Sequence, residues 1–292
     1  GLVLESEGGI RIGGIVYSHQ IVIWQEPAGK LLVVNDLDME TYIKSVIAWE
    51  ANPKWSPEAL KAQAIAARTF ALFRALANTD KKYDVLGDVI GQVYKGKNTS
   101  HPKTDSVVEA TRGQILTSKG KVFPAYYHST CGGKTTGIET FWNMEPNPSL
   151  RGIQCEFCKN SPHYSWQFSI PEKKLEEILK KQGYRFIDIQ KVIPVELDES
   201  GRAKRIRIEA RQGKAAVKAA DFRVWMGPED FKSTYIKSAE VVGDSVRFRG
   251  RGWGHGVGMC QFGMKYLGEI GYNYKQILQY YYPESEITNL SA

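Results

Sequence analysis

Three short stretches of this 292-residue sequence carry side chains whose types and spacing suit chemistry. In the first, Glu50 follows Trp49 at the expected end of a helix, with Trp55 close behind it. The dipole of that helix disfavours a carboxylate at this end, and apolar neighbours further disfavour the charged form of the acid. An acid that keeps its proton near neutral pH suits general acid catalysis. The alternative is an ordinary surface carboxylate on a turn.

The second stretch combines cysteines with histidines. Cys155 and Cys158 form a Cys-x2-Cys pair, a spacing typical of structural zinc, and His128 and Cys131 precede them in the chain. These four residues predict a closed, tetrahedral zinc site with no hydrolytic role, with His163 as the substitute for His128. A disulfide, which an exported location favours, and free buried thiols are the competing interpretations.

The third stretch is GRGWGHGVGM at 250–259. The glycines at alternate positions are too many for a regular strand and predict a tight loop. We expect this loop to present backbone N–H groups and the imidazole of His255, and a helix bearing Gln261 to follow it. It is not a phosphate loop, because the Lys-Ser/Thr that ends such loops is absent.

Two helices must position Glu50. Hydrophobic spacing predicts the first over about 38–49, and a Ser-Pro start signal followed by alanines predicts the second over 57–76. Gln63 and Arg68 lie among those alanines. If that face is buried, the guanidinium needs a partner, for which a carboxylate is the obvious choice; the alternative is that both side chains face water.

The rest of the chain reads as short strands with a few helices. Three strands are predicted within 10–35, and a hairpin from 114 onward is expected to deliver Tyr126 to Cys131 on its second strand. Segment 166–245 shows strands and two helices and no evident catalytic group. The predicted fold is therefore α+β: a helical pair packed on mixed or antiparallel sheets in a core of 1–165 with 246–292, and a smaller α/β subdomain inserted at 166–245.

Composition agrees with an ordinary globular protein, with 42% hydrophobic and 24% charged residues. The 39 basic and 32 acidic residues give a net charge of +7, and small basic groups suit a polyanion or an anionic wall surface; solvated faces are the alternative. No nucleic-acid motif accompanies this charge, so nucleic acid is not an expected partner. No apolar run reaches the roughly 18–20 residues of a membrane span.

Three blocks of the sequence resemble the SpoIID/LytB family of peptidoglycan-cleaving proteins. They are YIKSVIAWEANPKWSPEALKAQAIAARTFAL from Tyr42, YYHSTCGGKT from Tyr126 and GRGWGHGVGMCQFGM from Gly250, in the order of the family. The resemblance implies a lytic transglycosylase in which Glu50 protonates the oxygen between MurNAc and GlcNAc, then takes the proton of the sugar's own 6-hydroxyl as a 1,6-anhydro ring closes. This intramolecular attack replaces the second carboxylate that ordinary glycosidases need.

The resemblance has further implications. The residues expected to line the substrate cleft are Gln63, Arg68, Ser129, His255 and Gln261. The substrate would be glycan strands stripped of stem peptides, supplied by a partner N-acetylmuramoyl-L-alanine amidase similar to SpoIIP, and the chemistry would need no cofactor. Cys260 stands where the family commonly has serine, so no ligand role is expected for it.

The expected location is extracytoplasmic: secreted, periplasmic or anchored through a segment that precedes Gly1. One alternative function is a glycan-binding module that stimulates an amidase without cleaving anything. A zinc-dependent hydrolase is a third hypothesis.

Overall fold

The computed structural model describes residues 1–87, 92–96, 101–142 and 144–290. Its contacts divide the chain into two compact units. Unit 1 consists of Gly1–Tyr126, Leu267–Tyr280 and Glu284–Ala292, and unit 2 of Tyr127–Tyr266 and Tyr281–Pro283. The division expected from the sequence, with an insert at 166–245, stays a prediction; the contact-defined units are cut at different positions.

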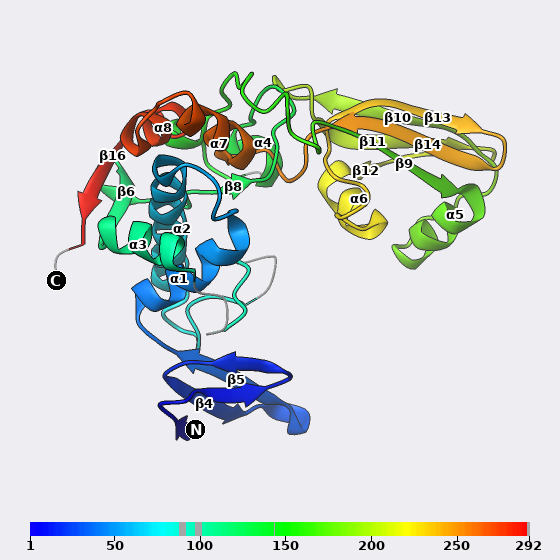
Figure 1. Cartoon of the computed structure of the whole chain (residues 1–292). Helices are drawn as coiled ribbons and strands as arrows, with labels where there is room; N and C mark the ends of the chain where they lie inside the picture. The colour runs from blue at the N-terminus through cyan, green and yellow to red at the C-terminus, as the bar shows by residue number, and fades with distance from the viewer. Residues whose placement is uncertain (88–91, 97–100, 143, 291–292) are drawn as a thin grey trace. The chain divides into compact units, whose positions relative to one another are not determined.

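Unit 1 opens with small antiparallel sheets (Figure 1). Strands β1 (Leu2–Glu5), β4 (Gln20–Gln25) and β5 (Leu31–Asp36) form one sheet in the order β1-β4-β5, and β2 (Ile10–Ile12) and β3 (Ile15–Tyr17) form a hairpin. A 3-10 turn at Pro27–Gly29 joins β4 to β5. The structure thus has four strands in the stretch where three were predicted, because the Gly13-Gly14 turn folds a separate hairpin.

The predicted helical pair is confirmed. Helix α1 spans Met39–Glu50, and the Asp38 carboxylate caps it by accepting the N–H groups of Glu40 and Thr41. Helix α2 spans Pro57–Ala77, and the Ser56 hydroxyl caps it by accepting the N–H of Ala59. Ile43, Val46, Ile47, Leu60, Ala64 and Ala67 are fully buried. The small side chains of α2 allow this pair to pack closely, and α3 (Pro102–Ala110) lies against both helices.

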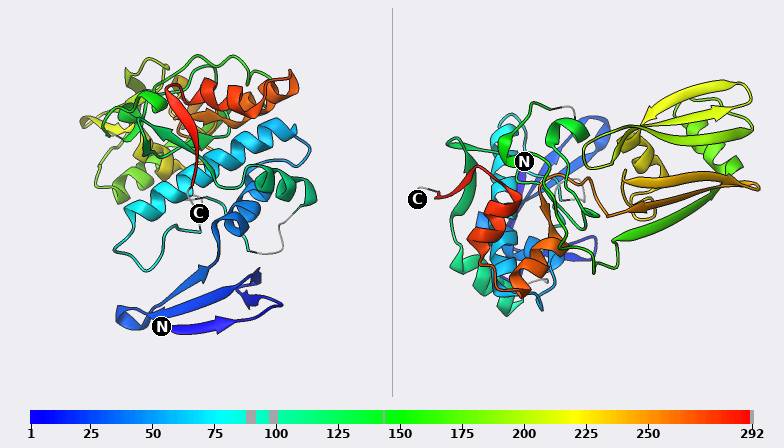
Figure 2. Two further views of the ribbon diagram at one scale, coloured as in Figure 1. Left: turned by 90° about the vertical axis from the view of Figure 1, so that its left-hand side faces the viewer. Right: turned by 90° about the horizontal axis from the view of Figure 1, so that it is seen from above.

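A three-stranded sheet completes unit 1, in the order β16-β6-β7. Its strands are β6 (Gln114–Ser118), β7 (Lys121–Val122) and β16 (Ser285–Asn289), and helix α8 (Tyr274–Tyr281) precedes β16 (Figure 2). The predicted hairpin at 114 is correct in its first strand and wrong in its second. In the second strand of the hairpin, only Lys121 and Val122 pair with β6, and the chain then leaves the sheet. Tyr127 and His128 form a separate strand, β8, in unit 2.

Unit 2 contains β8 (Tyr127–His128), which pairs in parallel with β15 (Met259–Cys260), and two antiparallel sheets of three strands. These are β10-β11-β12 (Ile189–Leu197, Ala203–Ala210, Gly213–Lys218) and β13-β14-β9 (Ile236–Val242, Ser245–Arg251, Ser165–Pro171). Helices α5 (Glu172–Lys181) and α6 (Ala219–Met226) lie on one side of these strands in Figure 1. Trp166, Phe222, Phe231 and Phe248 are at the centre of their shared core.

Three shorter elements lie between or after these sheets: α4 (Ile138–Trp142), a 3-10 turn at Pro148–Leu150 and α7 (Gln261–Glu269). The observed class is α+β, as predicted, with helices packed on small antiparallel sheets. Within the described parts of the chain, none of the helices combines the length and hydropathy needed to cross a membrane.

Candidate functional site

Glu50 is the last residue of α1 and is half-buried. The N–H of Val93 donates a hydrogen bond of 3.2 Å to its Oε1 atom. This donor comes from residues 92–96, which we call the strap, and it stabilises the charged form of the carboxylate. Glu50 is therefore held from outside its own helix, in the polar environment that a group exchanging protons needs.

The strap is attached to both helices by hydrogen bonds. Nε2 of Gln92 donates to the carbonyl of Ala67 in α2 at 3.0 Å, and the Ser45 hydroxyl of α1 donates to the carbonyl of Gly96 at 2.9 Å. Gln92, Ser45 and Gly96 are buried, so these bonds are shielded from water. The strap thus contacts α2 at Ala67 and α1 at both Ser45 and Glu50.

Aromatic contacts add to this attachment. The ring of Tyr94 lies 5.4 Å from that of the buried Tyr42, and the ammonium of Lys95 lies 4.0 Å from the ring of Trp49. Burial raises the pKa of the Tyr42 phenol, and the nearby negative charge of Glu50 raises it further. Tyr42 is therefore a neutral hydroxyl close to the acid. No motif in the sequence marks residues 92–96 for this role.

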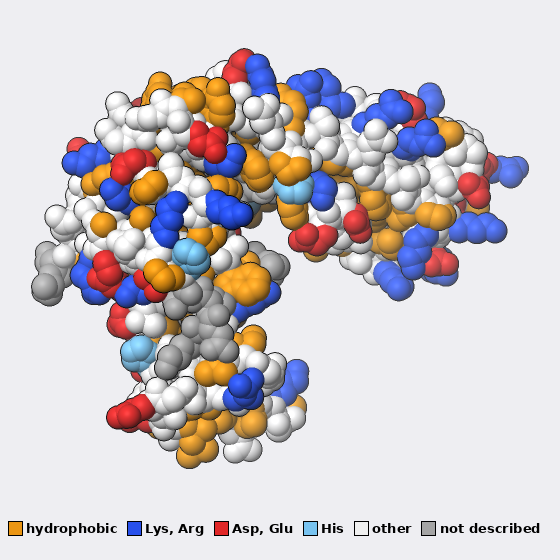
Figure 3. All heavy atoms as spheres, in the orientation of Figure 1, with side chains coloured by type: hydrophobic (Ala, Val, Ile, Leu, Met, Phe, Trp, Pro, Cys, Tyr) orange, Lys and Arg blue, Asp and Glu red, His pale blue; other side chains and the backbone are white. Residues whose placement is uncertain are grey.

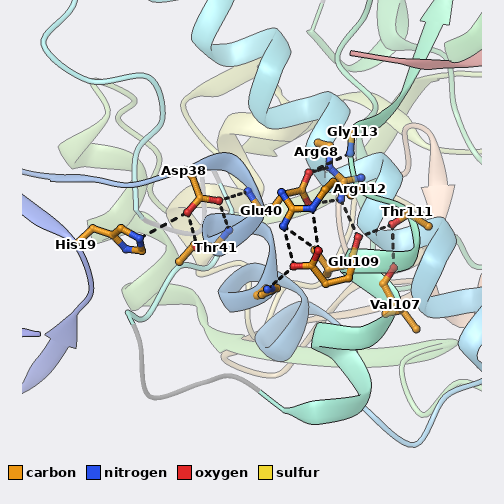
Figure 4. A network of polar contacts seen from close by, with 12 residues as sticks. His19, Asp38, Glu40, Thr41, Arg68, Val107, Glu109, Thr111, Arg112 and Gly113 are labelled. Carbon is orange, nitrogen blue, oxygen red and sulfur yellow. Dashed lines mark hydrogen bonds and ion pairs between the residues drawn. The ribbon is translucent and has the colours of Figure 1, made fainter. Parts of the chain in front are cut away.

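Arg68 has the carboxylate partner that burial demanded (Figure 4). Its Nε and Nη2 donate to Oε1 and Oε2 of Glu40 at 2.9 and 2.6 Å, and its Nη1 donates to the carbonyl of Gln114 at 3.0 Å. The N–H of Gly113 also donates to Glu40, at 3.1 Å. The guanidinium has no exposed surface. We therefore correct the prediction that Arg68 lines a cleft: it fixes α1 against α2 and β6.

Gln63 is also completely buried in α2. Its amide nitrogen and oxygen have no hydrogen-bond partner among the described residues, which is costly for a buried amide. Its predicted contact with substrate stays a prediction. Glu50, Gln63 and Arg68 all belong to unit 1, whereas the other predicted cleft residues, Ser129 and Gln261 with the glycine-rich loop, belong to unit 2.

His255 uses both ring nitrogens within the protein. Its Nδ1 accepts the N–H of Val257 at 3.0 Å, so the proton is on Nε2, which donates to the carbonyl of Tyr127 at 3.0 Å. Burial lowers the pKa of His255 well below its usual value, and the neighbouring charge of Arg223 acts in the same direction. His255 is therefore a neutral imidazole that connects the loop to β8, and not the ligand-facing ring that was predicted.

The glycine-rich loop likewise uses its N–H groups internally. Those of Gly252, Trp253 and Gly254 donate to the carbonyls of Tyr164, Thr130 and Lys232. A Cβ at Gly254 would lie 2.7 Å from the Cβ of His128, and one at Gly256 would lie 2.4 Å from the guanidinium carbon of Arg202. The glycines thus permit close packing onto the protein's own residues. The three N–H groups named here therefore bond within the protein, in contrast to the predicted presentation to a ligand.

Ser129 and Gln261 directly follow the paired strands β8 and β15. The carbonyl of Ser129 accepts the N–H of Phe262 at 3.1 Å, which places the start of α7 beside β8. The hydroxyl of Ser129 is half-buried and lies 3.4 Å from that of Thr130, and Gln261 is 7% exposed. Their predicted contact with substrate stays a prediction.

Two aromatic side chains next to His255 were not predicted. The rings of Trp142 and Phe141 lie 5.0 and 5.9 Å from the imidazole, and Trp142 is 37% exposed. A partly exposed indole over a rigid base offers an apolar face of the kind that sugar rings pack against. The sequence signal was the adjacent Phe-Trp pair, which lacked any periodic context.

Four thiols converge in unit 2. The sulfur atoms of Cys131, Cys155, Cys158 and Cys260 lie within 4.8 Å of one another, and all four residues are buried. His128 does not belong to this group: its Nδ1 donates to the carbonyl of Val257 at 3.1 Å. The predicted ligand set is corrected accordingly. The parallel pairing of β15 with β8 brings Cys260, which had been given no role, to the place assigned to His128.

Basic side chains are scattered over one face of unit 2. In Figure 3, Lys and Arg side chains spread over the part that holds β9 to β14. The small basic groups of the sequence are Lys173, Lys174, Lys180 and Lys181, which lie on α5, and Arg202, Lys204, Arg205 and Arg207, of which Arg202 is buried. The expectation of an anionic partner therefore rests on the exposed members alone.

Comparison with known proteins places the chain in a family context. Residues 27–118 match the family model described as SpoIID, stage II sporulation protein, and residues 154–258 match a domain of unknown function. An uncharacterised protein of Brachyspira hyodysenteriae is 32% identical over 99% of this chain and 77% of its own length.

Other relatives have descriptive names, including the following two. Stage II sporulation protein D of Bacillus subtilis is 28% identical over 89% of this chain and 77% of its own length. The amidase enhancer of the same organism is 26% identical over 85% of this chain and 40% of its own length. The SpoIID family match at 27–118 includes Glu50 and the helical pair. The match to the domain of unknown function at 154–258 includes His255 and the Cys-x2-Cys pair.

Proposed function

Because this chain belongs to the SpoIID/LytB family and shares its connection with sporulation and the cell wall, we propose that it is a lytic transglycosylase of peptidoglycan. It cleaves the β-1,4 bond from MurNAc to GlcNAc in the glycan strand and leaves a 1,6-anhydro-MurNAc end. Glu50 is the catalytic residue.

In this reaction Glu50 donates its proton to the bridging oxygen while the bond from that oxygen to C1 of MurNAc breaks. The O6 hydroxyl of the same MurNAc attacks C1 and closes the anhydro ring. The Glu50 carboxylate takes the hydroxyl proton, which regenerates the acid. No water is consumed, and proximity within one sugar replaces a second carboxylate.

The observation that carries the proposal is the hydrogen bond from Val93 to Glu50. A residue that acts first as an acid and then as a base must be able to adopt both its protonated form and its charged form during the reaction. The terminal position on α1 disfavours the carboxylate, whereas the Val93 N–H stabilises it. These opposed effects, on an acid that the strap holds in place through hydrogen bonds at the buried Gln92 and Gly96, support the double role of Glu50.

The substrate class and partners follow from the same proposal. The strands would be stripped of stem peptides by an N-acetylmuramoyl-L-alanine amidase, and the protein would act outside the cytoplasm. The exposed lysines of α5 suit an anionic wall surface, and the partly exposed Trp142 suits a sugar ring.

A second candidate function comes from the relative named amidase enhancer. In that case the chain binds glycan and raises the rate of an amidase without cutting the strand. The two functions differ in whether a covalent bond of the sugar chain is broken.

The test is incubation of the protein with peptide-free glycan strands, followed by mass spectrometry of the ends. We expect 1,6-anhydro-MurNAc ends from the wild type and a loss of about 10²- to 10⁴-fold in their rate of formation in Glu50→Gln. The matched control is Glu26→Gln, which changes a partly exposed carboxylate of the same unit that pairs with Lys82. A wild type that forms no anhydro ends yet accelerates a purified amidase contradicts the proposal and supports the enhancer function.

A further inference from the structure

The four thiols of Cys131, Cys155, Cys158 and Cys260 form a cluster that the proposed reaction does not use. We propose that they bind one zinc ion as four thiolates, with Cys260 as the fourth ligand. Zinc prefers tetrahedral thiolate sets of this kind in structural sites. The inference concerns a site separate from Glu50 and stands whether or not the chain cleaves glycan.

The spacing of the sulfur atoms fits such an ion. Zinc–sulfur bonds of about 2.3 Å give edges of about 3.8 Å between the sulfurs of a tetrahedron. All four sulfurs here lie within 4.8 Å of one another, and those of Cys131 and Cys158 are 3.4 Å apart. Each of the four residues is at most 1% exposed. The ion would therefore have a closed coordination sphere, without room for a water that could hydrolyse a substrate.

Backbone groups around the cluster suit charged sulfur atoms. The N–H of Cys131 donates to the sulfur of Cys260 at 3.3 Å, and the N–H of Gly133 points to the sulfur of Cys131 at 3.5 Å. Hydrogen bonds that orient the ligands of a metal are a regular part of such sites. Here the tight turn at Gly132-Gly133 provides one of them.

Arg202 provides positive charge next to the thiols. It is 2% exposed, and its guanidinium donates to the carbonyls of Cys131 and Lys134, at 2.6 and 2.9 Å, and to the hydroxyl of Ser200. All three acceptors are uncharged, although a buried guanidinium demands compensating negative charge. A divalent ion with four thiolates carries net negative charge and would supply it together with nearby Asp198.

The ion would join segments that are distant in the sequence. Cys131 follows β8, Cys155 and Cys158 belong to one loop, and Cys260 directly follows the glycine-rich loop in β15. Zinc would thereby hold that loop, with His255, against β8. Its role is structural: removal of the ion is expected to loosen unit 2 while leaving the helical pair of unit 1 folded.

The deciding measurement is X-ray absorption at the zinc edge of the full chain, purified under reducing conditions, together with its metal content. We expect one zinc per chain, surrounded by four sulfurs at about 2.3 Å and no nitrogen at about 2.0 Å. A shell of three sulfurs and one nitrogen overturns the assignment of Cys260. Iron in place of zinc, or disulfide-linked cysteine peptides in a non-reducing digest, overturns the zinc site.

Two variants separate the competing fourth ligands. Cys260→Ser is expected to lower the sulfur number from four to three and to speed zinc transfer to a chromogenic chelator at least about tenfold. His128→Gln is expected to keep four sulfurs. The reverse pattern contradicts the proposal. If Cys260→Ser does not fold, the wild-type spectrum still decides, because a four-sulfur shell cannot form from Cys131, Cys155 and Cys158 alone.

Discussion

Arg68 and Glu40 form a buried, two-pronged ion pair, with nitrogen–oxygen distances of 2.9 and 2.6 Å. Glu40 is in the first turn of α1 and Arg68 is in the middle of α2, so the pair sets how the two helices meet. Glu50, at the other end of α1, takes its position from this arrangement. An interaction that touches no substrate therefore contributes to the placement of the acid.

Loss of one partner of this pair should be costly. Arg68→Met leaves the Glu40 carboxylate buried without its partner, and we expect a loss of about 3–5 kcal/mol in the free energy of unfolding, measured in urea. The matched control is Arg112→Met, which removes an ion pair to Glu109 from an exposed surface and should cost at most about 1 kcal/mol. Equal losses in the two variants would contradict the structural role given to Arg68.

The hydrogen bond from the strap to Glu50 should influence how kcat depends on pH. Val93→Pro removes the N–H that donates to Glu50, which disfavours the charged form of the acid. The general acid then keeps its proton to higher pH. We expect the limb on which kcat falls with rising pH to move upward by about 0.5–1 unit, with a lower maximum. Val93→Ala keeps the N–H and should leave the profile in place; a shift in both variants would rule out the hydrogen bond as its cause.

Packing of the glycine-rich loop can be tested by adding one methyl group. At Gly256, with φ of +89°, a Cβ would lie 2.4 Å from the Arg202 guanidinium, whereas at Gly243, with φ of +62°, it would meet nothing within 4 Å. Both alanine variants carry the backbone penalty of a positive φ, about 1–2 kcal/mol. We expect Gly256→Ala to lose about 1–3 kcal/mol more than Gly243→Ala in thermal or urea unfolding. Similar losses would show that the loop does not press on Arg202.

Acid should destabilise unit 2 through two histidines that are neutral in the folded state, the buried His128 and the half-buried His255. Burial lowers the pKa of His128 to about 3 and that of His255 well below 6.5. The folded state therefore stays neutral where the unfolded state binds protons. The contribution of these neutral histidines to the free energy of unfolding is complete above about pH 6.5. It is lost as the pH falls below that value, by up to about 1.4 kcal/mol per pH unit for each histidine.

The measurement is the free energy of unfolding between pH 7.5 and about 5, in wild type and variants. His255→Gln should make this dependence shallower, although its absolute stability is lower. His19→Gln changes a half-exposed side chain and should leave the slope unchanged. A wild-type stability that stays flat over this interval would contradict the neutral state of both rings in the folded protein.

Much of the local structure was determined by the sequence alone. The Ser56-Pro57 start signal and the alanines of α2 specify that helix through capping and propensity, which act within a few residues. Local hydrogen bonding also shapes the turn at 198–201 between β10 and β11, where the Asp198 carboxylate accepts the N–H of Ser200. The demand of Arg68 for a carboxylate was also predictable, because a buried guanidinium has few other solutions.

Only the tertiary structure decided which groups meet. Glu40 as the partner of Arg68, Val93 as the donor to Glu50 and Cys260 beside Cys131 all join residues that are 28, 43 and 129 positions apart. Local propensity carries no information at such separations, because many pairings of the same chemistry are equally compatible with it. The glycines of the loop show the same limit. Their freedom of φ was visible in the sequence, but the surface they pack against, formed by His128 and Arg202, exists only once the strands have paired.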